Sequence, residues 1–315
     1  MKSGTTSGLP DAIYSSFQSA FRSLLGQKTA GPPKLTPELE QQIFETCALD
    51  CPEVCSDLVL VSKMVYKWID PILLATVCIT EEFHSQRQGK MKSFLAKLTS
   101  GKMPLEYYAQ HVKNLGIFGG HYEEGEIDRV LAICTGVENL VINKMVILNK
   151  SVKSLAFFDN PQAGTALRRL YVNLWWNTSD ASAMPTFDTV RFRSLTHLHL
   201  ADDDENWPFY TGWETLVSLT HLAFACCSPE LLAPVMQVLP VIRYVALGHY
   251  RGGEQYRYAD VVVNNSPYIR AAWGVRVVFL SEIPRADWER GARGGGDFWD
   301  VVEEEVERRL QDGSG

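Results

Sequence analysis

A short pattern of apolar residues recurs from residue 112 onward and constrains the fold more than any other feature of this sequence. The pattern places apolar residues at the first, fourth and sixth of six positions, and successive segments start 15 to 33 residues apart. The eight segments begin at Val112, Val137, Val152, Leu167, Leu195, Leu219, Ile242 and Val275. Because each unit of such a repeat can bury its apolar face only against its neighbours, the pattern predicts a stack of short parallel strands around one continuous core.

The alternation within each segment predicts which side chains enter that core. Successive side chains of a strand point to opposite faces, so the fourth and sixth positions should face the core and the third and fifth the concave side. Apolar stretches at 127–133 and 231–239 lie between the segments, and we expect them to form helices on the convex side. The predicted fold class is therefore α/β, with an irregular solenoid of parallel strands over residues 91–290.

The third and fifth positions supply the candidate binding residues. Five of them carry side chains suited to recognition, namely Arg169, His197, His199, His221 and Tyr244. At about 4.8 Å between neighbouring strands, such a column would form either a recognition surface for an unknown protein substrate or a row of solvated polar groups. Three imidazoles could also bind zinc, but Ala223 takes the next fifth position and the pattern places no carboxylate beside them. The sequence therefore predicts no metal site and no other cofactor.

A helical module is predicted ahead of the repeats, over residues 35–80. Thr36 suits a helix N-cap, and Pro37 suits the first helical position, where its missing N–H is not needed. Apolar residues at helical spacing follow, with Pro52 breaking the pattern and Pro71 stopping or bending a second helix that runs on through residues 72–77. The apolar faces are too large for so small a module, so part of this surface should meet a partner or the next domain.

The two ends of the chain differ from its body. Residues 1–34 are rich in Ser, Gly and Thr, and we interpret them as a flexible arm with one short amphipathic stripe, with a lipid-surface or targeting segment as the alternative. Residues 291–315 form a Gly-rich hinge followed by an amphipathic helix that Asp297 should cap. We expect this helix to cover the open end of the solenoid.

Composition excludes several classes of protein. A net charge of −7 argues against a nucleic-acid partner, and no apolar run approaches the length of about 20 residues that crosses a membrane. Seven scattered cysteines without a secretory signal favour reduced thiols in the cytoplasm or nucleus. The usual phosphate-binding, nucleophile-elbow and zinc-protease motifs do not occur, so we expect no catalytic residue and no enzyme.

The helical module resembles an F-box. The segments Leu35-Thr-Pro-Glu-Leu-Glu-Gln-Gln-Ile-Phe44 and Leu58-Val-Leu-Val-Ser-Lys-Met-Val-Tyr-Lys-Trp68 match the family's opening and closing motifs, apart from Thr36 and Glu40. Both departures lie where the family meets its adaptor. The resemblance implies that an apolar set faces a Skp-type adaptor protein or forms the module's fold: Leu35, Pro37, Leu39, Ile43, Phe44, Leu58, Val61, Val65 and Trp68.

The whole chain also resembles the F-box-like leucine-rich-repeat proteins of mushroom-forming, basidiomycete fungi. The phrases that carry the likeness are LTPELEQQIFE, CTGVENL, SLTHLHLAD, SLTHLAF and DWERGARGGGDFW. It implies a non-catalytic adaptor, the substrate-recognition subunit of a Skp–cullin–F-box ubiquitin ligase. The alternative is a free-standing leucine-rich-repeat binding module whose F-box-like helices only cap the solenoid.

Overall fold

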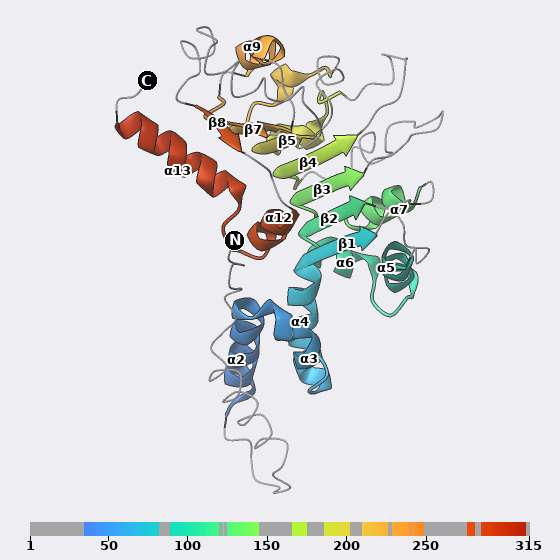
Figure 1. Ribbon diagram of the computed structural model, residues 1–315. Helices are drawn as coiled ribbons and strands as arrows, with labels where there is room; N and C mark the ends of the chain where they lie inside the picture. The colour runs from blue at the N-terminus through green and yellow to red at the C-terminus, as the bar shows by residue number, and fades with distance from the viewer. Residues whose placement is uncertain are drawn as a thin grey trace, which may run out of the picture. The chain divides into compact units, whose positions relative to one another are not determined.

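The chain folds into an α/β structure around one sheet of eight parallel strands, which lie in chain order (Figure 1). This computed structural model describes residues 35–81, 89–119, 122, 125–144, 166–174, 186–201, 210–225, 229–239, 241–248, 276–280 and 285–312. The strands are β1 (Thr76–Glu81), β2 (Asn114–Gly119), β3 (Asn139–Lys144), β4 (Arg169–Leu174), β5 (His197–Leu200), β6 (His221–Phe224), β7 (Tyr244–Gly248) and β8 (Val277–Leu280). Of the two compact units Met1–Ile43 and Phe44–Gly315, the second contains the whole sheet.

Helices pack on both faces of the sheet (Figure 1). One face carries α5 (Lys90–Thr99), α6 (Leu105–His111), α7 (Glu126–Ile133) and α9 (Pro229–Val238), with the 3-10 turns η3 (Val190–Ser194) and η5 (Trp213–Thr215). The opposite face carries α12 (Arg285–Ala292) and α13 (Phe298–Gln311). The N-terminal helices are α2 (Pro37–Asp50), η1 (Pro52–Val54), α3 (Cys55–Leu58) and α4 (Lys63–Ala75). Among the described helices, none combines the length and apolar character needed to span a membrane.

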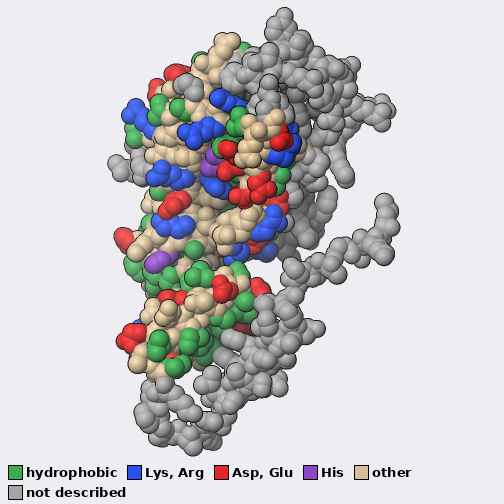
Figure 2. Space-filling view, turned by 90° about the vertical axis from the view of Figure 1, so that its left-hand side faces the viewer, with side chains coloured by type: hydrophobic (Ala, Val, Ile, Leu, Met, Phe, Trp, Pro, Cys, Tyr) green, Lys and Arg blue, Asp and Glu red, His purple; other side chains and the backbone are tan. Residues whose placement is uncertain are grey.

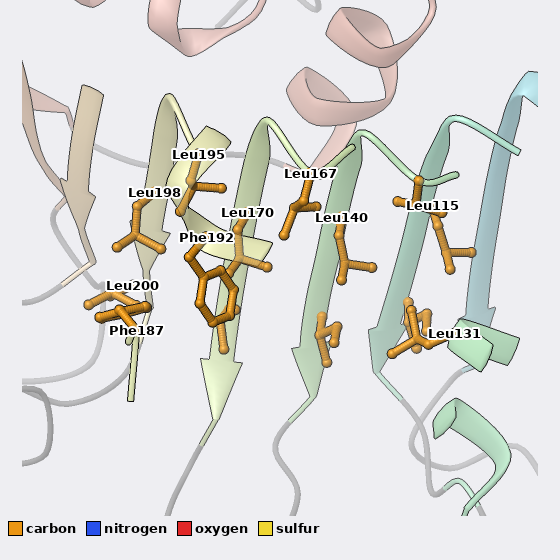
Figure 3. Close-up of a cluster of buried hydrophobic side chains, with 14 of the residues drawn as sticks. Leu115, Leu131, Leu140, Leu167, Leu170, Phe187, Phe192, Leu195, Leu198 and Leu200 are labelled. Atoms are coloured by element: carbon orange, nitrogen blue, oxygen red, sulfur yellow. The ribbon is translucent and has the colours of Figure 1, made fainter. Parts of the chain in front are cut away.

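The repeat pattern is confirmed as the source of the core. First, fourth and sixth positions lie in one hydrophobic cluster, and Figure 3 shows part of it on the core face of the sheet. Fourth-position residues from β2 to β6 pair in register and are at most 3% exposed: Leu115, Leu140, Leu170, Leu198 and Leu222. This continuous stack supplies the main hydrophobic stabilisation of the fold. The segment that begins at Val152 lies outside the described residues.

Backbone hydrogen bonds at the second position keep the repeats in step. The Lys113 carbonyl accepts hydrogen bonds from the Glu138 and Asn139 amides at 2.8 and 3.1 Å. The same two-amide arrangement recurs at four further second-position carbonyls, those of Glu138, Arg168, Thr196 and Thr220. The backbone amides at the start of each of these strands thus find a hydrogen-bond acceptor in the preceding repeat, as buried backbone groups require.

Two details of the predicted repeat are wrong. The sheet begins at β1, inside the predicted helical module, because the β-branched run from Thr76 to Thr80 pairs with β2 instead of extending a helix. In the last segment the register differs by one residue: Val277 pairs with Val245 in the core, and Val278 faces the other way. That segment is almost entirely apolar, so alternation could not determine which residues face inward.

The N-terminal helices have a small core of their own within residues 44–75. Ala48, Cys55, Leu58, Val65 and Ile69 are its buried members. The Ser62 hydroxyl begins α4 by accepting a hydrogen bond from the Val65 amide at 3.1 Å, and Pro71 lies inside this helix without ending it. Helix α2 begins as predicted, because Thr36 Oγ1 accepts a hydrogen bond from the Leu39 amide at 3.5 Å.

The described cysteines form no disulfide with one another. Cys47, Cys51, Cys55 and Cys134 are free thiols. Burial raises the pKa of Cys134 to about 12, so this thiol acts as a small apolar core residue. The predicted arm, residues 1–34, lies outside the described residues.

The C-terminal helix forms as predicted but in a different place. Asp297 caps α13 by accepting a hydrogen bond from the Trp299 amide at 2.8 Å, and the Asp300 carboxylate accepts one from the Asp297 amide. Instead of covering the open end of the stack, the helix lies across the sheet face opposite the core. Small side chains at fifth positions, Ala223 and Ala246, let it approach closely.

Candidate functional site

A row of polar side chains crosses the sheet face beneath α12 and α13. It occupies in-register positions on seven neighbouring strands, and we call it the polar row: Thr76, Asn114, Asn139, Arg169, His197, His221 and Tyr244. Neighbouring strands lie about 4.8 Å apart, so the side chains of adjacent members of the row are close enough to contact each other. The sequence analysis missed its first three members, although both asparagines occupy third positions of the repeat.

The first half of the polar row is bonded to α12. The Ala292 carbonyl accepts hydrogen bonds from Thr76 Oγ1 at 3.1 Å and from Asn114 Nδ2 at 2.9 Å. Trp288 Nε1 donates to Asn139 Oδ1 at 2.9 Å. Trp288 also lies over Gly116, where any Cβ would come within 2.6 Å of its ring. This glycine therefore provides the space in which α12 docks.

The second half of the polar row is bonded to α13 and its cap. Arg169 Nη1 donates to Asp297 Oδ2 at 2.7 Å, in an ion pair whose carboxylate is nearly buried. Tyr244 donates from its hydroxyl to Glu307 Oε1 at 2.9 Å. Acidic residues thus meet the polar row at the N-cap of α13 and again in the second half of the helix.

The two histidines of the row form a stacked pair. Their ring centroids lie 3.8 Å apart with an angle of 10° between the planes, and each ring meets Trp299 edge-on at 5.3 Å. His221 Nε2 lies 3.0 Å from Glu303 Oε1. His197 Nε2 is buried and has no hydrogen-bond partner among the described residues.

A threonine hydroxyl lies beside Nδ1 of each histidine. The Thr196 oxygen lies 2.8 Å from Nδ1 of His197 and 3.0 Å from the Arg168 carbonyl oxygen. The Thr220 oxygen likewise lies 2.8 Å from Nδ1 of His221 and 3.3 Å from the Thr196 carbonyl oxygen. Each hydroxyl has one proton, which can go to the carbonyl or to the imidazole, so both tautomers of each ring fit these contacts.

Burial makes these imidazoles hard to protonate. Burial, with smaller contributions from His221 and Arg169, lowers the pKa of His197 to about 2. Burial and Arg169 lower the pKa of His221 to about 4, and burial alone lowers that of His199 to about 3. Burial also raises the pKa of Glu303. At neutral pH the three histidines are therefore uncharged and can accept through a nitrogen lone pair.

The predicted recognition column lies against another part of the same chain. Arg169, His197, His221 and Tyr244 are brought together as predicted, but the chain's own C-terminal segment already bonds or covers them. His199 lies on the neighbouring row, fully covered between Tyr171 and Phe298. The repeat pattern could not predict these contacts, because the residues that make them, 285–312, lie outside the repeats.

The nine residues assigned to adaptor binding separate into two groups. Four of them are exposed, namely Leu35, Pro37, Leu39 and Ile43. The other five are buried or partly buried in the small helical core, namely Phe44, Leu58, Val61, Val65 and Trp68. Further exposed apolar residues that the sequence analysis did not single out are Leu49, Leu60, Met64 and Tyr66. Figure 2 shows hydrophobic side chains gathered over the N-terminal helices, in contrast to the mixed charges over α13.

Comparisons with known proteins add no family assignment. No protein-family model matches the chain, and no curated protein is significantly similar to it.

Proposed function

We propose that this chain is a non-catalytic protein-binding adaptor, a substrate-recognition subunit of a Skp–cullin–F-box ubiquitin ligase. The observation that carries the proposal is the amount of apolar surface left exposed on the N-terminal helices. Leu35, Leu39, Ile43, Leu49, Leu60, Met64 and Tyr66 are 42–82% exposed. These seven exposed large apolar side chains within residues 35–66 favour a protein–protein interface in this part of the chain.

The sheet is the second part of this proposal. We interpret it as a leucine-rich-repeat solenoid, with its strands on the concave side and α5, α6, α7 and α9 on the convex side. The buried first, fourth and sixth positions and the recurring carbonyl contacts support this interpretation. In a cytoplasmic or nuclear ligase, the helical module would bind the Skp-type adaptor and the solenoid would carry the substrate surface.

Co-purification with the Skp-type adaptor tests the first half of the proposal. We expect a complex at micromolar concentration with the unmodified chain. The double variant Leu39→Asp/Ile43→Asp should weaken binding at least tenfold, because each charge would enter an apolar interface. Both side chains are about half exposed, so the variant should retain its circular dichroism spectrum and melting temperature.

A matched control distinguishes the docking surface from any exposed apolar residue. Leu310→Asp places the same charge at a side chain of similar exposure on α13, and it should leave adaptor binding unchanged. Failure of the folded, unmodified chain to bind the adaptor would rule out the ligase role. If Leu310→Asp weakened adaptor binding as much as the double variant does, the helical module would not be the docking surface.

A second function, a free-standing binding module with a helical cap, has its own supporting observation. Helix α4 runs directly into β1, and its buried Asp70 accepts a hydrogen bond from the Tyr107 hydroxyl at 2.8 Å. Lys97 also lies 3.6 Å from this carboxylate. If capping is the module's role, deletion of residues 1–61 should lower the melting temperature of the sheet strongly, whereas a cooperative melt at unchanged temperature would contradict it.

A further inference from the structure

Three potential metal ligands meet where α13 crosses β5 and β6. The nitrogen atoms of His197 and His221 and a carboxylate oxygen of Glu303 all lie within 4.8 Å of one another. Both histidines come from neighbouring strands, and Glu303 comes from a helix 82 residues further along the chain than His221. Fold and helix placement together therefore create a cluster that no local sequence motif contains.

One nitrogen of this cluster lacks a hydrogen-bond partner in the described part of the chain. Thr196 Oγ1 and Thr220 Oγ1 lie 2.8 Å from Nδ1 of His197 and His221, and His221 Nε2 lies 3.0 Å from Glu303 Oε1. His197 Nε2 is buried without a hydrogen-bond partner among the described residues. A cation bound here would satisfy this nitrogen and replace the proton shared by His221 and Glu303.

The chemistry of these ligands suits one class of cation. Two neutral imidazoles and a carboxylate are a ligand set of zinc and related divalent transition metals, with a fourth position open to water. The threonine hydroxyls hold the other nitrogen of each ring, as second partners of metal-bound histidines usually do. Asp297, Asp300 and Glu307 act electrostatically on Glu303, whereas Arg169 and Arg243 act on His221.

We propose that His197, His221 and Glu303 bind a divalent transition-metal ion of the zinc type, which fastens α13 to the sheet. Ligands of a tetrahedral zinc lie about 3.4 Å apart at bond lengths of about 2.1 Å. The His221 Nε2–Glu303 Oε1 pair, at 3.0 Å, must therefore open slightly, and the His197 nitrogen must approach it from within 4.8 Å. The rings must also turn out of their parallel stack so that both Nε2 lone pairs meet at the ion. The site is independent of the adaptor role and would hold the polar row closed.

Metal loading of the full chain tests the proposal. Chelator-treated protein is dialysed against zinc chloride, freed of excess metal and measured for zinc by mass spectrometry, with the melting temperature recorded in parallel. We expect close to one equivalent of zinc per chain and a higher melting temperature with zinc. Less than a tenth of an equivalent in folded protein would overturn the proposal.

Variants locate the ion. Glu303→Gln and His221→Gln should each weaken zinc binding at least tenfold, because each removes one of three ligands. Glu307→Gln is the matched control, since it lies one turn further along α13 and bonds Tyr244 instead of a histidine. Unchanged zinc binding in both ligand variants would place the metal elsewhere and refute the site.

Cobalt substitution separates this site from the cysteines of the helical module, Cys47, Cys51 and Cys55. A cobalt ion bound by nitrogen and oxygen shows visible bands without the near-ultraviolet sulfur-to-metal absorption of a thiolate site. We expect visible bands alone, and their loss in Glu303→Gln. Sulfur-to-metal absorption in the unmodified chain would assign the ion to the cysteines and contradict the proposal.

Discussion

At the residue scale, the surroundings of each histidine determine its role. His197 and His221 each have a threonine hydroxyl 2.8 Å from Nδ1, and His221 Nε2 lies 3.0 Å from Glu303 on α13. His199 has no hydrogen-bond partner for either ring nitrogen among the described residues and packs against aromatic rings. One residue type thus supplies potential ligands in one row and an apolar contact in the next.

The burial of His199 predicts a loss of stability in mild acid. Its pKa is about 3 in the folded chain, against about 6.5 when unfolded, so the unfolded chain binds the extra proton between these values. The contribution of neutral His199 is therefore complete above pH 6.5 and is lost as the pH falls, by up to about 1.4 kcal/mol per pH unit. Urea unfolding at neutral pH and at about pH 5 measures this slope.

The variant His199→Leu provides the control for this prediction. Leucine cannot bind a proton, so the difference in unfolding free energy between the two pH values should shrink relative to the unmodified chain. His197 and His221 retain their own lowered pKa values, and part of the slope should persist. An identical slope in the variant would show that His199 is not responsible.

At the element scale, α13 is held by its cap as much as by its apolar side. Asp297 accepts a hydrogen bond from the Trp299 amide with one carboxylate oxygen and forms the ion pair with Arg169 through the other. Phe298, Trp299, Val302 and Val306 are the residues that this helix buries. Asp297 therefore both caps the start of α13 and anchors the helix to the sheet.

Two substitutions at Asp297 separate these contributions. Asp297→Asn keeps a capping oxygen and loses the ion pair, whereas Asp297→Ala loses both. We expect the alanine variant to be less stable than the asparagine variant by about 0.5–2 kcal/mol, the usual value of an N-cap. Urea unfolding measures both free energies, and equal values for the two variants would show that the cap contributes nothing.

At the scale of the whole molecule, one core runs through all the repeats. The fourth-position leucines stack from strand to strand (Figure 3), and side chains from the helices on the core face complete the cluster. Helix α13 packs on the other face with a smaller cluster that includes Ala223, Ala246 and Val278. The core face therefore supplies most of the buried apolar surface that stabilises the fold, while the opposite face carries the contacts with α13.

A truncation in the middle of this stack should affect the entire sheet. Leu198 is fully buried, so Leu198→Ala should lower the free energy of unfolding by about 2–5 kcal/mol. The control Val217→Ala alters a side chain that is 64% exposed and should change it by less than about 0.5 kcal/mol. Chemical denaturation measures both, and similar small losses would contradict a continuous core.

Features that depend on local pattern could be predicted from the amino-acid sequence. Alternation within each repeat identified Leu115 and Leu198 as core residues, and helical spacing with a capping residue identified α13 and the helices of the N-terminal module. These signals are local because side-chain direction follows directly from strand or helix geometry. The same alternation was ambiguous for residues 275–280, where almost every side chain is apolar.

What the polar row contacts depends on tertiary packing. The repeat pattern places no carboxylate beside His197 and His221, yet α13 places Glu303 3.0 Å from His221. The column that the repeat predicted as a recognition surface lies against the C-terminal segment, residues 285–312. The physical reason is that helix placement depends on small fifth-position residues, such as Ala223 and Ala246, and on contacts between distant segments, which no periodicity along the chain records.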